Sequence, residues 1–449
     1  MGLIKTKKGL RLPISGAPDQ EILEGKSVRQ IALLGPDYEG LKPQFDVKLG
    51  DPVQLGQTLF IDKKSPKVRY TSPGAGKIKA IHRGKKRRFL SIIIELDGQK
   101  EVAFKSYSEK RILDLKMDQI ISQLLESGLW TALRSRPFGK VADPDTLPHS
   151  IFITAMDTNP LSPSIPKTLK GKEDAFRLGQ VILSKLTDGT LYICQAPGET
   201  FSKANLSQLK VEEFAGVHPA GNAGTHIHFL DPVHSHKTVW TIGAQDVAAI
   251  GTLFMTGKLD TTRIVALGGP EVKNPRLLKT QMGASISDLV ANECKPGLRR
   301  VISGSVFNGH IADEQLAFLG RYHQQITVLP ETKSRMLLGW LSPGFKLYSL
   351  KNIVASKLMP WVTLDFNTLQ HGGRRAIVPV GSYEKVMPLD ILPTYLLRAL
   401  AAIDIDESEK LGCLELVEED LALCTVVCPS KIDHGENLRR ILNIIEKEG

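Results

Sequence analysis

The sequence lacks any apolar run long enough to cross a membrane. A spanning helix needs about 18 or more consecutive apolar residues, and no stretch of the 449 residues provides them. The closest stretch, residues 239–255, contains Asp246 and predicts a buried helix or a pair of strands. Residues 1–16 also lack the apolar core that is typical of a secretory leader. We therefore expect a cytoplasmic chain that does not itself cross the membrane.

Cysteine is also scarce. The five cysteines are widely scattered and odd in number, which predicts a reducing compartment and no structural disulfides. Cys424 and Cys428 form the closest pair, at the end of a predicted helix, and only Cys413 lies near them. An iron–sulfur cluster requires four ligands, usually thiolates. We therefore interpret these cysteines as core residues and predict no Fe–S cluster.

Aromatic residues make up only 6% of the sequence, and no basic stretch is interleaved with them. Modules that stack nucleic-acid bases need that pattern, so we expect no nucleic-acid partner. The net charge of +10 still favours an acidic partner, such as a phospholipid headgroup layer or an acidic protein, although solvated lysines alone could explain it. No HExxH motif and no set of nucleophile, base and carboxylate is recognisable, so no catalytic residue is predicted.

The length predicts several domains, because a single hydrophobic core rarely serves so long a chain. Residues 1–103 alternate short apolar runs with glycine and proline turns, which indicates a β domain. Residues 104–257 begin with helical periodicity over 112–125 and continue as strand, helix and strand, which is typical of a parallel α/β layer. We expect a small, mostly β module over 258–330 and a mostly helical domain over 331–449.

The N-terminal region is similar to the biotinyl/lipoyl carrier fold. The turns at Gly50 and Gly56 and the return segment 72–78 match that fold, and Lys63 and Lys64 lie near its exposed hairpin tip. In carriers the modified lysine falls slightly further past the second glycine, and the residues that usually flank it are missing here. The comparison therefore implies a carrier-like fold without lipoate or biotin.

Five of the eleven histidines lie within residues 218–236. Zinc needs three or four converging ligands, and His226 and His228 would share a face only on a strand. Because Asp231-Pro232 separates them from the last two histidines, we expect no metal site. The glycines of segment 221–224 could cradle a phosphate, but the sequence does not indicate the strand–loop–helix context that such a cradle needs. A crowded surface turn is the third interpretation.

Several long and unusual strings, taken in order along the chain, indicate a family. They are ALLGPDYEGLKP, ESGLWTALRSRPFGKV, TAMDTNPL, HPAGNAGTHIHFLDPV, ISGSVFNGH, VMPLDILPT and EEDLALCTVVCP. Over essentially its whole length the sequence resembles the A-subunit family of sodium-translocating NADH:quinone oxidoreductases. That family is related to the NADH-binding subunit of complex I and to the largest soluble subunit of the Rnf complex. The resemblance implies a carrier-like β domain, a Rossmann-like α/β domain, a β-grasp module of the SLBB type and a helical C-terminal domain.

The comparison with this wider group implies that nucleotide binding has been lost. Relatives that bind FMN and NADH have a glycine-rich loop after the first helix, where the matching segment 128–140 keeps only Gly128 and Gly139. A second loop carries an acidic pair in those relatives, and Gly224 and Thr225 replace it here. We therefore expect no FMN and no NADH site. The degenerate loop comprises His218, Gly221, Gly224, Thr225, His226 and His228.

The resemblance also implies a role in the quinone step. It implies a peripheral subunit on the cytoplasmic face of the bacterial inner membrane, bound to integral membrane subunits and especially to the B subunit. That complex reduces ubiquinone to ubiquinol and exports Na+. Our hypothesis is that apolar and aromatic side chains with a few donors border a quinone-accessible surface: Leu33, Leu34, Tyr38, Leu129, Trp130, Thr131, Arg134, Arg136 and Phe138. The alternatives are an FMN- and NADH-binding dehydrogenase subunit of the complex I type and a docking scaffold without quinone contact.

Overall fold

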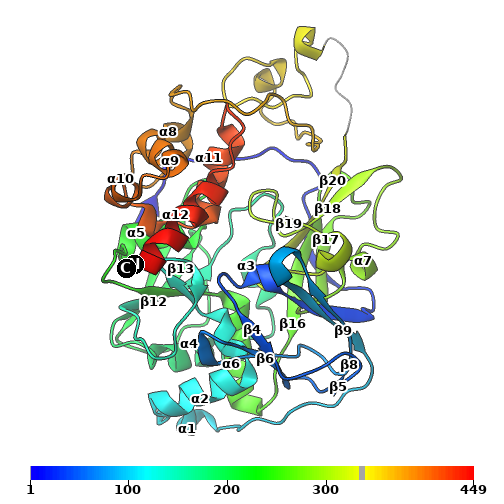
Figure 1. Ribbon diagram of the computed structural model, residues 1–449, viewed down its shortest axis with the longest axis vertical. Helices are drawn as coiled ribbons and strands as arrows, with labels where there is room; N and C mark the ends of the chain where they lie inside the picture. The colour runs from blue at the N-terminus through cyan, green and yellow to red at the C-terminus, as the bar shows by residue number, and fades with distance from the viewer. Residues whose placement is uncertain (1, 333–338, 449) are drawn as a thin grey trace.

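The computed structural model describes residues 2–332 and 339–448, which Figure 1 shows as a mixture of sheets and helices. Within these residues the strands form sheets of seven, six, four and three members, which confirms a protein with mixed α/β and β regions. No helix in the described part of the chain is long and apolar enough to cross a bilayer.

The N-terminal region consists of two small antiparallel sheets that share one hydrophobic core. One sheet contains β3 (Gln30–Leu34), β5 (Pro52–Val53), β8 (Gly76–Arg83) and β9 (Phe89–Leu96), and the other contains β4 (Pro43–Phe45), β6 (Thr58–Asp62) and β7 (Ser65–Thr71). Gly50 and Gly56 have φ angles of 85° and 84°, so both predicted turns favour glycine. Lys63 and Lys64 lie in the turn between β6 and β7, as expected, and Lys85–Arg87 lies at the tip of the β8–β9 hairpin.

The next region is built on the seven-stranded sheet, whose order is β1-β14-β13-β12-β15-β10-β11. The five strands from β1 to β15 run parallel, and β10 joins them antiparallel. The strands are β1 (Leu3–Lys5), β10 (Arg134–Arg136), β11 (Lys140–Val141), β12 (Ser150–Ala155), β13 (Thr190–Gln195), β14 (Leu209–Ala215) and β15 (Val239–Gly243). The helices are α1 (Glu109–Leu113), α2 (Met117–Ser127), α3 (Ile165–Thr168), α4 (Glu173–Ser184), α5 (Ala223–Leu230) and α6 (Ala244–Thr256). The expected unit of strand, helix and parallel strand is confirmed as β12, α4 and β13.

The apolar run 239–255 is neither a single helix nor a pair of strands. Its first part is strand β15, and its second part is helix α6, which begins directly after Gly243. Helix α6 packs very closely on α4 because both carry a glycine at the contact. A Cβ atom at Gly251 would lie 1.8 Å from the carbonyl oxygen of Ala175, and one at Gly179 would lie 2.1 Å from that of Val247.

The six-stranded sheet, in the order β19-β18-β20-β16-β17-β2, forms the third region. Its strands are β2 (Asp19–Glu24), β16 (Thr262–Gly268), β17 (Arg276–Gln281), β18 (Arg299–Ser303), β19 (His310–Ile311) and β20 (Gln325–Pro330). Its helix α7 (Ile286–Leu289) begins at Ser285, whose hydroxyl oxygen accepts the backbone N–H of Asp288. β1 and β2 pair with strands β14 and β17 of later regions, so the first 24 residues depart from the predicted division at 1–103. A strand pattern alone does not specify the partner strand.

The C-terminal region is helical from residue 382 onward. Its helices are α8 (Ser382–Val386), α9 (Pro393–Ala402), α10 (Ile405–Lys410), α11 (Ala422–Val427) and α12 (His434–Glu448). Residues 342–381 contain only one short 3-10 turn, Ala355–Leu358, so the prediction of a mostly helical 331–449 was too broad; within that range, 333–338 lie outside the described residues.

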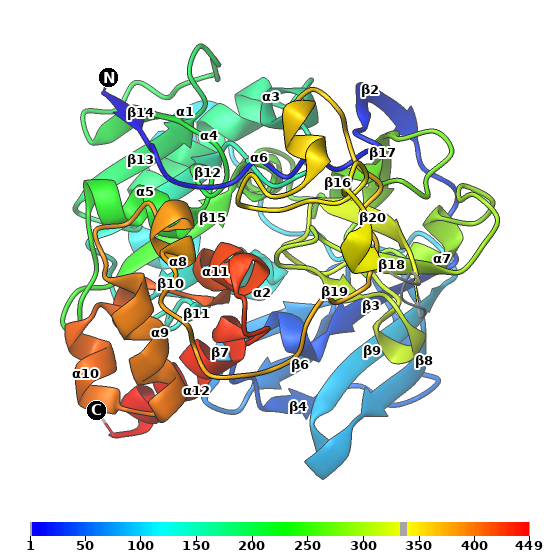
Figure 2. The same cartoon turned by 90° about the horizontal axis from the view of Figure 1, so that it is seen from above.

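The cysteines of this region lie in its core. Cys413, Cys424 and Cys428 are all buried, as predicted, and the Cys428 Sγ atom lies 3.1 Å from the Tyr383 hydroxyl. Burial raises the pKa of Cys424 to about 12, so its thiol is protonated at neutral pH. Figure 2 shows the helices gathered beside α5, β10 and β11, where the candidate site lies.

Candidate functional site

A cavity of about 440 Å³ lies where all four regions of the chain meet. Part of its wall is the carboxyl ends of the parallel strands β12 and β15, the place where open α/β sheets commonly bind ligands. Further parts of the wall come from the start of α5, from segments 36–39, 132–139, 321–324 and 417–419, and from Asp246, Arg263 and Arg439. The cleft is therefore a candidate ligand site, and its walls carry charges of both signs.

One wall of the cleft is a buried carboxylate held by two arginines. Asp246 accepts hydrogen bonds from Arg263 at 2.5 Å and from Arg321 at 3.1 Å. Burial opposes ionisation of Asp246, but the two arginines lower its pKa below the usual value. This carboxylate therefore stays charged and fixes the two arginines. The Asp246 carboxylate thus finds its ionic partners within the chain.

Asp37 behaves differently from Asp246. Its carboxylate accepts the backbone N–H of Arg321 at 2.8 Å, without a side-chain hydrogen bond from an arginine. Burial raises the pKa of Asp37 to about 7, against the lowering effect of that hydrogen bond and of the nearby arginines. The cleft thus contains one carboxyl group that titrates near neutrality.

Arg134 and Tyr322 join the sheet edge to the third region. The Arg134 guanidinium lies 4.9 Å from the centre of the Tyr322 ring, a cation–π distance. The Tyr322 hydroxyl donates to the carbonyl oxygen of Thr131 at 2.8 Å, and burial raises its pKa to about 12. Sequence analysis missed Asp37, Asp246, Arg263, Arg321 and Tyr322 as members of the cleft. Asp246, a lone charge within an apolar run, was a signal that a buried partner must exist.

The histidine-rich stretch forms part of a strand–loop–helix unit. β14 ends at Ala215, and α5 begins after Asn222. The expectation that a strand–loop–helix context is absent here was therefore wrong. His226 and His228 lie on helix α5, and the strand on which they would share a face does not form. A helix of only eight residues is too short to show clear apolar periodicity.

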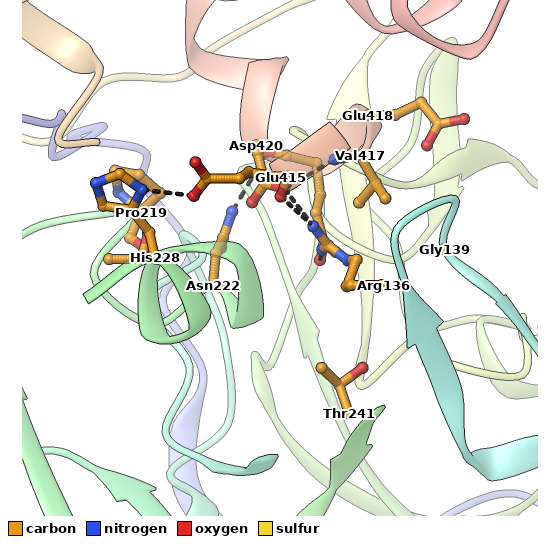
Figure 3. Close-up of polar contacts among 12 residues, drawn as sticks. Arg136, Gly139, Pro219, Asn222, His228, Thr241, Glu415, Val417, Glu418 and Asp420 are labelled. Atoms are coloured by element: carbon orange, nitrogen blue, oxygen red, sulfur yellow. Dashed lines mark hydrogen bonds and ion pairs between the residues drawn. The ribbon is translucent and has the colours of Figure 1, made fainter. Parts of the chain in front are cut away.

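The place where an anion would approach α5 is filled by a carboxylate of the same chain. Figure 3 shows Asp420 beside the start of α5, and a Cβ atom at Gly224 would lie 2.3 Å from its Oδ1 atom. Arg136 donates to Asp420 at 2.8 Å, and the N–H of Val417 donates to it at 3.0 Å. Asn222 also donates to the carbonyl oxygen of Glu419. The residues present therefore do not fit a phosphate at this helix N-terminus.

The histidines and the other residues of the degenerate loop serve local contacts. His218 stacks on Phe307 with ring centres 4.8 Å apart, and His226 is fully buried with its Nε2 atom 3.0 Å from the carbonyl oxygen of Ala220. Burial lowers the pKa of both histidines to about 3, so both rings are neutral. The N–H of Gly221 donates to the Thr158 hydroxyl, and the Thr225 hydroxyl donates to the carbonyl oxygen of Pro219.

His228 links α5 to the C-terminal region. Its Nε2 atom accepts the backbone N–H of Asp390 at 3.0 Å, and its Nδ1 atom lies 2.7 Å from a Glu415 carboxylate oxygen. Because Nε2 accepts, Nδ1 carries the proton that is donated to Glu415. The histidines thus face different partners. No group of three or more potential metal ligands occurs within 2–332 or 339–448.

Segment 128–140 is closed by side chains of its own chain. A Cβ atom at Gly128 would lie 2.3 Å from the Thr71 hydroxyl oxygen, so strand β7 covers the backbone there. Trp130 is fully buried, donates its indole N–H to the carbonyl oxygen of Ala142 and meets Trp240 edge-on. This segment therefore has little bare backbone for a phosphate to approach.

The nine residues of the quinone hypothesis fall into separate places. Leu33, Tyr38, Leu129 and Thr131 line a second cavity of about 20 Å³, which is enough for about one water molecule. Leu34 and Trp130 lie in the core, and Arg134 lines the large cleft. Arg136 and Phe138 contact the C-terminal region: Arg136 binds Glu419 and Asp420, and the Phe138 carbonyl oxygen accepts from Arg439 at 2.7 Å.

Three family descriptions match the chain. The NqrA N-terminal barrel-sandwich hybrid domain matches residues 4–97, the NqrA second alpha/beta domain matches 115–259, and the NQRA C-terminal domain matches 264–314. Among solved structures, an NAD+-reducing NiFe-hydrogenase in the air-oxidised state covers 50% of this chain and 49% of its own at 14% identity. Its TM-score of 0.37 is too low to support a conclusion.

Curated relatives match the chain from end to end. The A subunit of the Na(+)-translocating NADH-quinone reductase from Cellvibrio japonicus is 52% identical over 447 residues, and its counterpart from Neisseria meningitidis serogroup C is 49% identical over 447 residues. The counterpart from Alcanivorax borkumensis is 52% identical over 448 residues, and each match covers 100% of both chains. The chain therefore belongs to the family of Na(+)-translocating NADH-quinone reductase A subunits.

Proposed function

We propose that this chain acts as the A subunit of a sodium-pumping NADH:quinone reductase and takes part in its quinone-reduction step. The observation that carries this proposal is identity of about one half to relatives of that name, extending over the whole of both chains. In this proposal the chain is peripheral, on the cytoplasmic face of the bacterial inner membrane, and is held by integral membrane subunits, the B subunit in particular. The complex reduces ubiquinone to ubiquinol and exports Na+.

We also propose that the regions keep the folds of cofactor-binding ancestors. The N-terminal sheets, with Lys63 and Lys64 in a hairpin turn, support a biotinyl/lipoyl-like domain. The parallel sheet supports a Rossmann-like domain, and the six-stranded sheet with α7 supports a β-grasp module of the SLBB type. The proposed divisions are 1–103, 104–257, 258–330 and 331–449, with β1 and β2 of the first division paired to strands of the second and third.

In this proposal the chain holds no flavin, NADH or Fe–S cluster of its own. Two contacts support it: Asp420 lies where an anion would approach α5, and Thr71 lies against Gly128. The dehydrogenase alternative requires a bound flavin, so absorbance of the purified chain distinguishes the two. A stoichiometric flavin band near about 450 nm would favour the dehydrogenase alternative.

Quinone contact is proposed at the surface bordered by segments 30–40 and 125–140. These two segments, distant in sequence, meet around one small cavity, and Arg321 lines both that cavity and the neighbouring cleft. The cleft lies within the size range of small-molecule sites, whereas the small cavity does not admit a ring. A quinone head group would therefore lie in the cleft beside Arg134, with the Tyr322 ring as an aromatic wall.

Photo-crosslinking of the assembled complex with a quinone analogue tests this contact. We expect label in 30–40 or 125–140, and label found only outside these segments would contradict the proposal. Arg134→Ala should raise the quinone KM of the complex by about tenfold, because a lost charged hydrogen-bond donor costs about 1.5 kcal/mol. Arg69→Ala, an exposed arginine on β7, is the matched control and should leave the KM unchanged. A scaffold without quinone contact predicts no label and no effect of either substitution.

A further inference from the structure

Residues 339–362 form a projecting segment at one end of the longest axis of the molecule (Figure 1). The segment closes on itself, because the N–H of Ala355 donates to the carbonyl oxygen of Pro343 at 2.8 Å and Ser356 donates to that of Leu347. It is attached to the body just beyond its end, where the N–H of Leu364 donates to the carbonyl oxygen of Pro13 at 2.7 Å. The segment is thus a folded loop with an anchored base.

The projecting segment exposes large apolar side chains. Leu358 is 79% exposed, Ile353 and Trp361 are each 76% exposed, and Leu341 and Phe345 are 62% and 57% exposed. Single exposed hydrophobic residues are common on protein surfaces, whereas five within one short loop mark an interaction surface. The described part of the chain leaves most of the surface of these side chains uncovered, so an external partner would bury them.

The charge around these side chains has one sign. Lys346 and Lys351 are exposed, and Lys357 lies over the Tyr348 ring with its Nζ atom 4.7 Å from the ring centre. Arg374 and Arg375 are exposed a little further along the chain. Between residues 339 and 381 the sequence contains one acidic residue, Asp365, and the Ser15 hydroxyl donates to it. The partner of this surface should therefore be acidic as well as apolar.

We propose that the projecting segment binds directly to the anionic headgroup surface of a lipid bilayer. Tryptophan is favoured at the interface between headgroups and acyl chains, and the apolar side chains of Leu358 and Ile353 would enter the same layer. Lysines can bury their methylene stems and leave the ammonium groups among anionic lipids. The anchored base holds the loop on the body of the protein. A bilayer satisfies the apolar and the basic groups together.

This inference adds a direct lipid contact to the partner-mediated attachment of the proposed function. Its test measures lipid binding by the full-length chain alone, without quinone or other subunits. Failure would therefore leave the proposed role in quinone reduction intact, and failure of the quinone role would leave lipid binding intact.

The experiment is co-sedimentation of the full-length chain with phosphatidylcholine vesicles that contain or lack phosphatidylglycerol. The chain should bind the anionic vesicles, and binding should weaken with added salt. The double substitution L358E/W361E should reduce the bound fraction at least about tenfold, since two apolar side chains lose their burial. L49E/L298E is the matched control: both leucines lie outside the segment, are 69% and 70% exposed, and should leave binding unchanged apart from the shared charge change.

The basic residues provide a second variant. K346E/K351E should abolish the preference for phosphatidylglycerol while the protein unfolds at its usual temperature, because both side chains are exposed. Absence of binding to anionic vesicles would overturn the proposal, and so would equal losses in L358E/W361E and L49E/L298E. If the segment variants instead prevented co-purification with the integral subunits without affecting vesicle binding, the surface would bind protein, which would also overturn it.

Discussion

Two regions of the molecule differ in the exposure of their side chains. One is the junction between α5 and the C-terminal helices, and the other is the projecting segment 339–362. At the junction, Arg136 and Asp420 are each about 3% exposed as side chains, and every charge there finds a partner within the chain. In the projecting segment, Leu358 and Trp361 are more than three quarters exposed, without apolar cover from the rest of the described chain. The chain itself buries and pairs the side chains of the junction, but it leaves the apolar side chains of the projecting segment exposed.

This difference separates a contact that is closed within the chain from a surface that is left exposed. Asp420 fills the space at the N-terminus of α5 where an anion would approach, so the junction functions as interior. Buried charges are tolerated only when paired, which explains why Arg136, Asp420 and Glu419 form one cluster. Exposed apolar groups lower the free energy only after a partner covers them, so the projecting segment is available for assembly.

The largest effect should come from breaking the junction. Arg136→Met keeps the length of the side chain but leaves Asp420 buried without its cation. We expect a loss of about 3–5 kcal/mol in the free energy of unfolding, measured by chemical denaturation. Burial opposes the charge of Arg136, but Asp420 and Glu419 raise its pKa above the usual value, which indicates a strongly coupled pair.

Lys79→Met is the control for that measurement. Lys79 pairs with Glu95 at 3.2 Å, but both side chains are about half exposed, so solvent screens the pair. Loss of this ion pair should lower the free energy of unfolding by about 0–1 kcal/mol. Equal effects of the two substitutions would show that the junction is not closed as described.

A smaller effect should come from acidification, which acts on the buried His226 of α5. Burial lowers the pKa of His226 to about 3, whereas the ordinary pKa of histidine is about 6.5. The folded state therefore keeps its full stability at pH values above about 6.5 and loses stability as the pH falls below that value, because the unfolded chain then binds a proton that the folded chain does not. Between pH 7 and pH 5 this one histidine should account for about 2 kcal/mol of lost stability. His226→Gln should lose correspondingly less over that range in denaturation at the two pH values. His236→Gln, at an exposed position, should follow the unsubstituted protein.

The smallest effect is expected in the projecting segment. Trp361→Ser should change the free energy of unfolding by no more than about 0.5 kcal/mol, because its side chain contributes little to the folded core. Thermal and chemical denaturation of the isolated chain measure this directly. A loss as large as that of Arg136→Met would place Trp361 in the core and remove the contrast between the two regions.

The local elements were well predicted where periodicity or turn chemistry is strong. The helical periodicity predicted over 112–125 corresponds to α1 and α2, and the turns at Gly50 and Gly56 also follow from local sequence. Helix α5 was missed because eight residues with two histidines show no clear period. The pairing of β1 with β14 was missed because their sequence separation exceeds two hundred residues.

The site was predicted less completely. The quinone hypothesis grouped residues of segments 30–40 and 128–140, and four of its nine residues line the same small cavity. It did not indicate that Arg263 and Arg321 would meet at Asp246, because the Arg321 contact spans 75 positions. Nor did it indicate that Asp420 would fill the N-terminus of α5, almost two hundred residues earlier in the chain.

The sequence by itself determined the family, the order of β and α/β regions, the basic character of the chain and the core position of its cysteines. These properties follow from composition, local spacing and similarity to relatives, all of which can be obtained from the sequence alone. Only the tertiary structure decided which charges neutralise one another at Arg136 and which apolar groups remain open near Trp361. The reason is physical: burial and pairing are properties of surfaces that meet in three dimensions, and distant segments supply both sides of each contact.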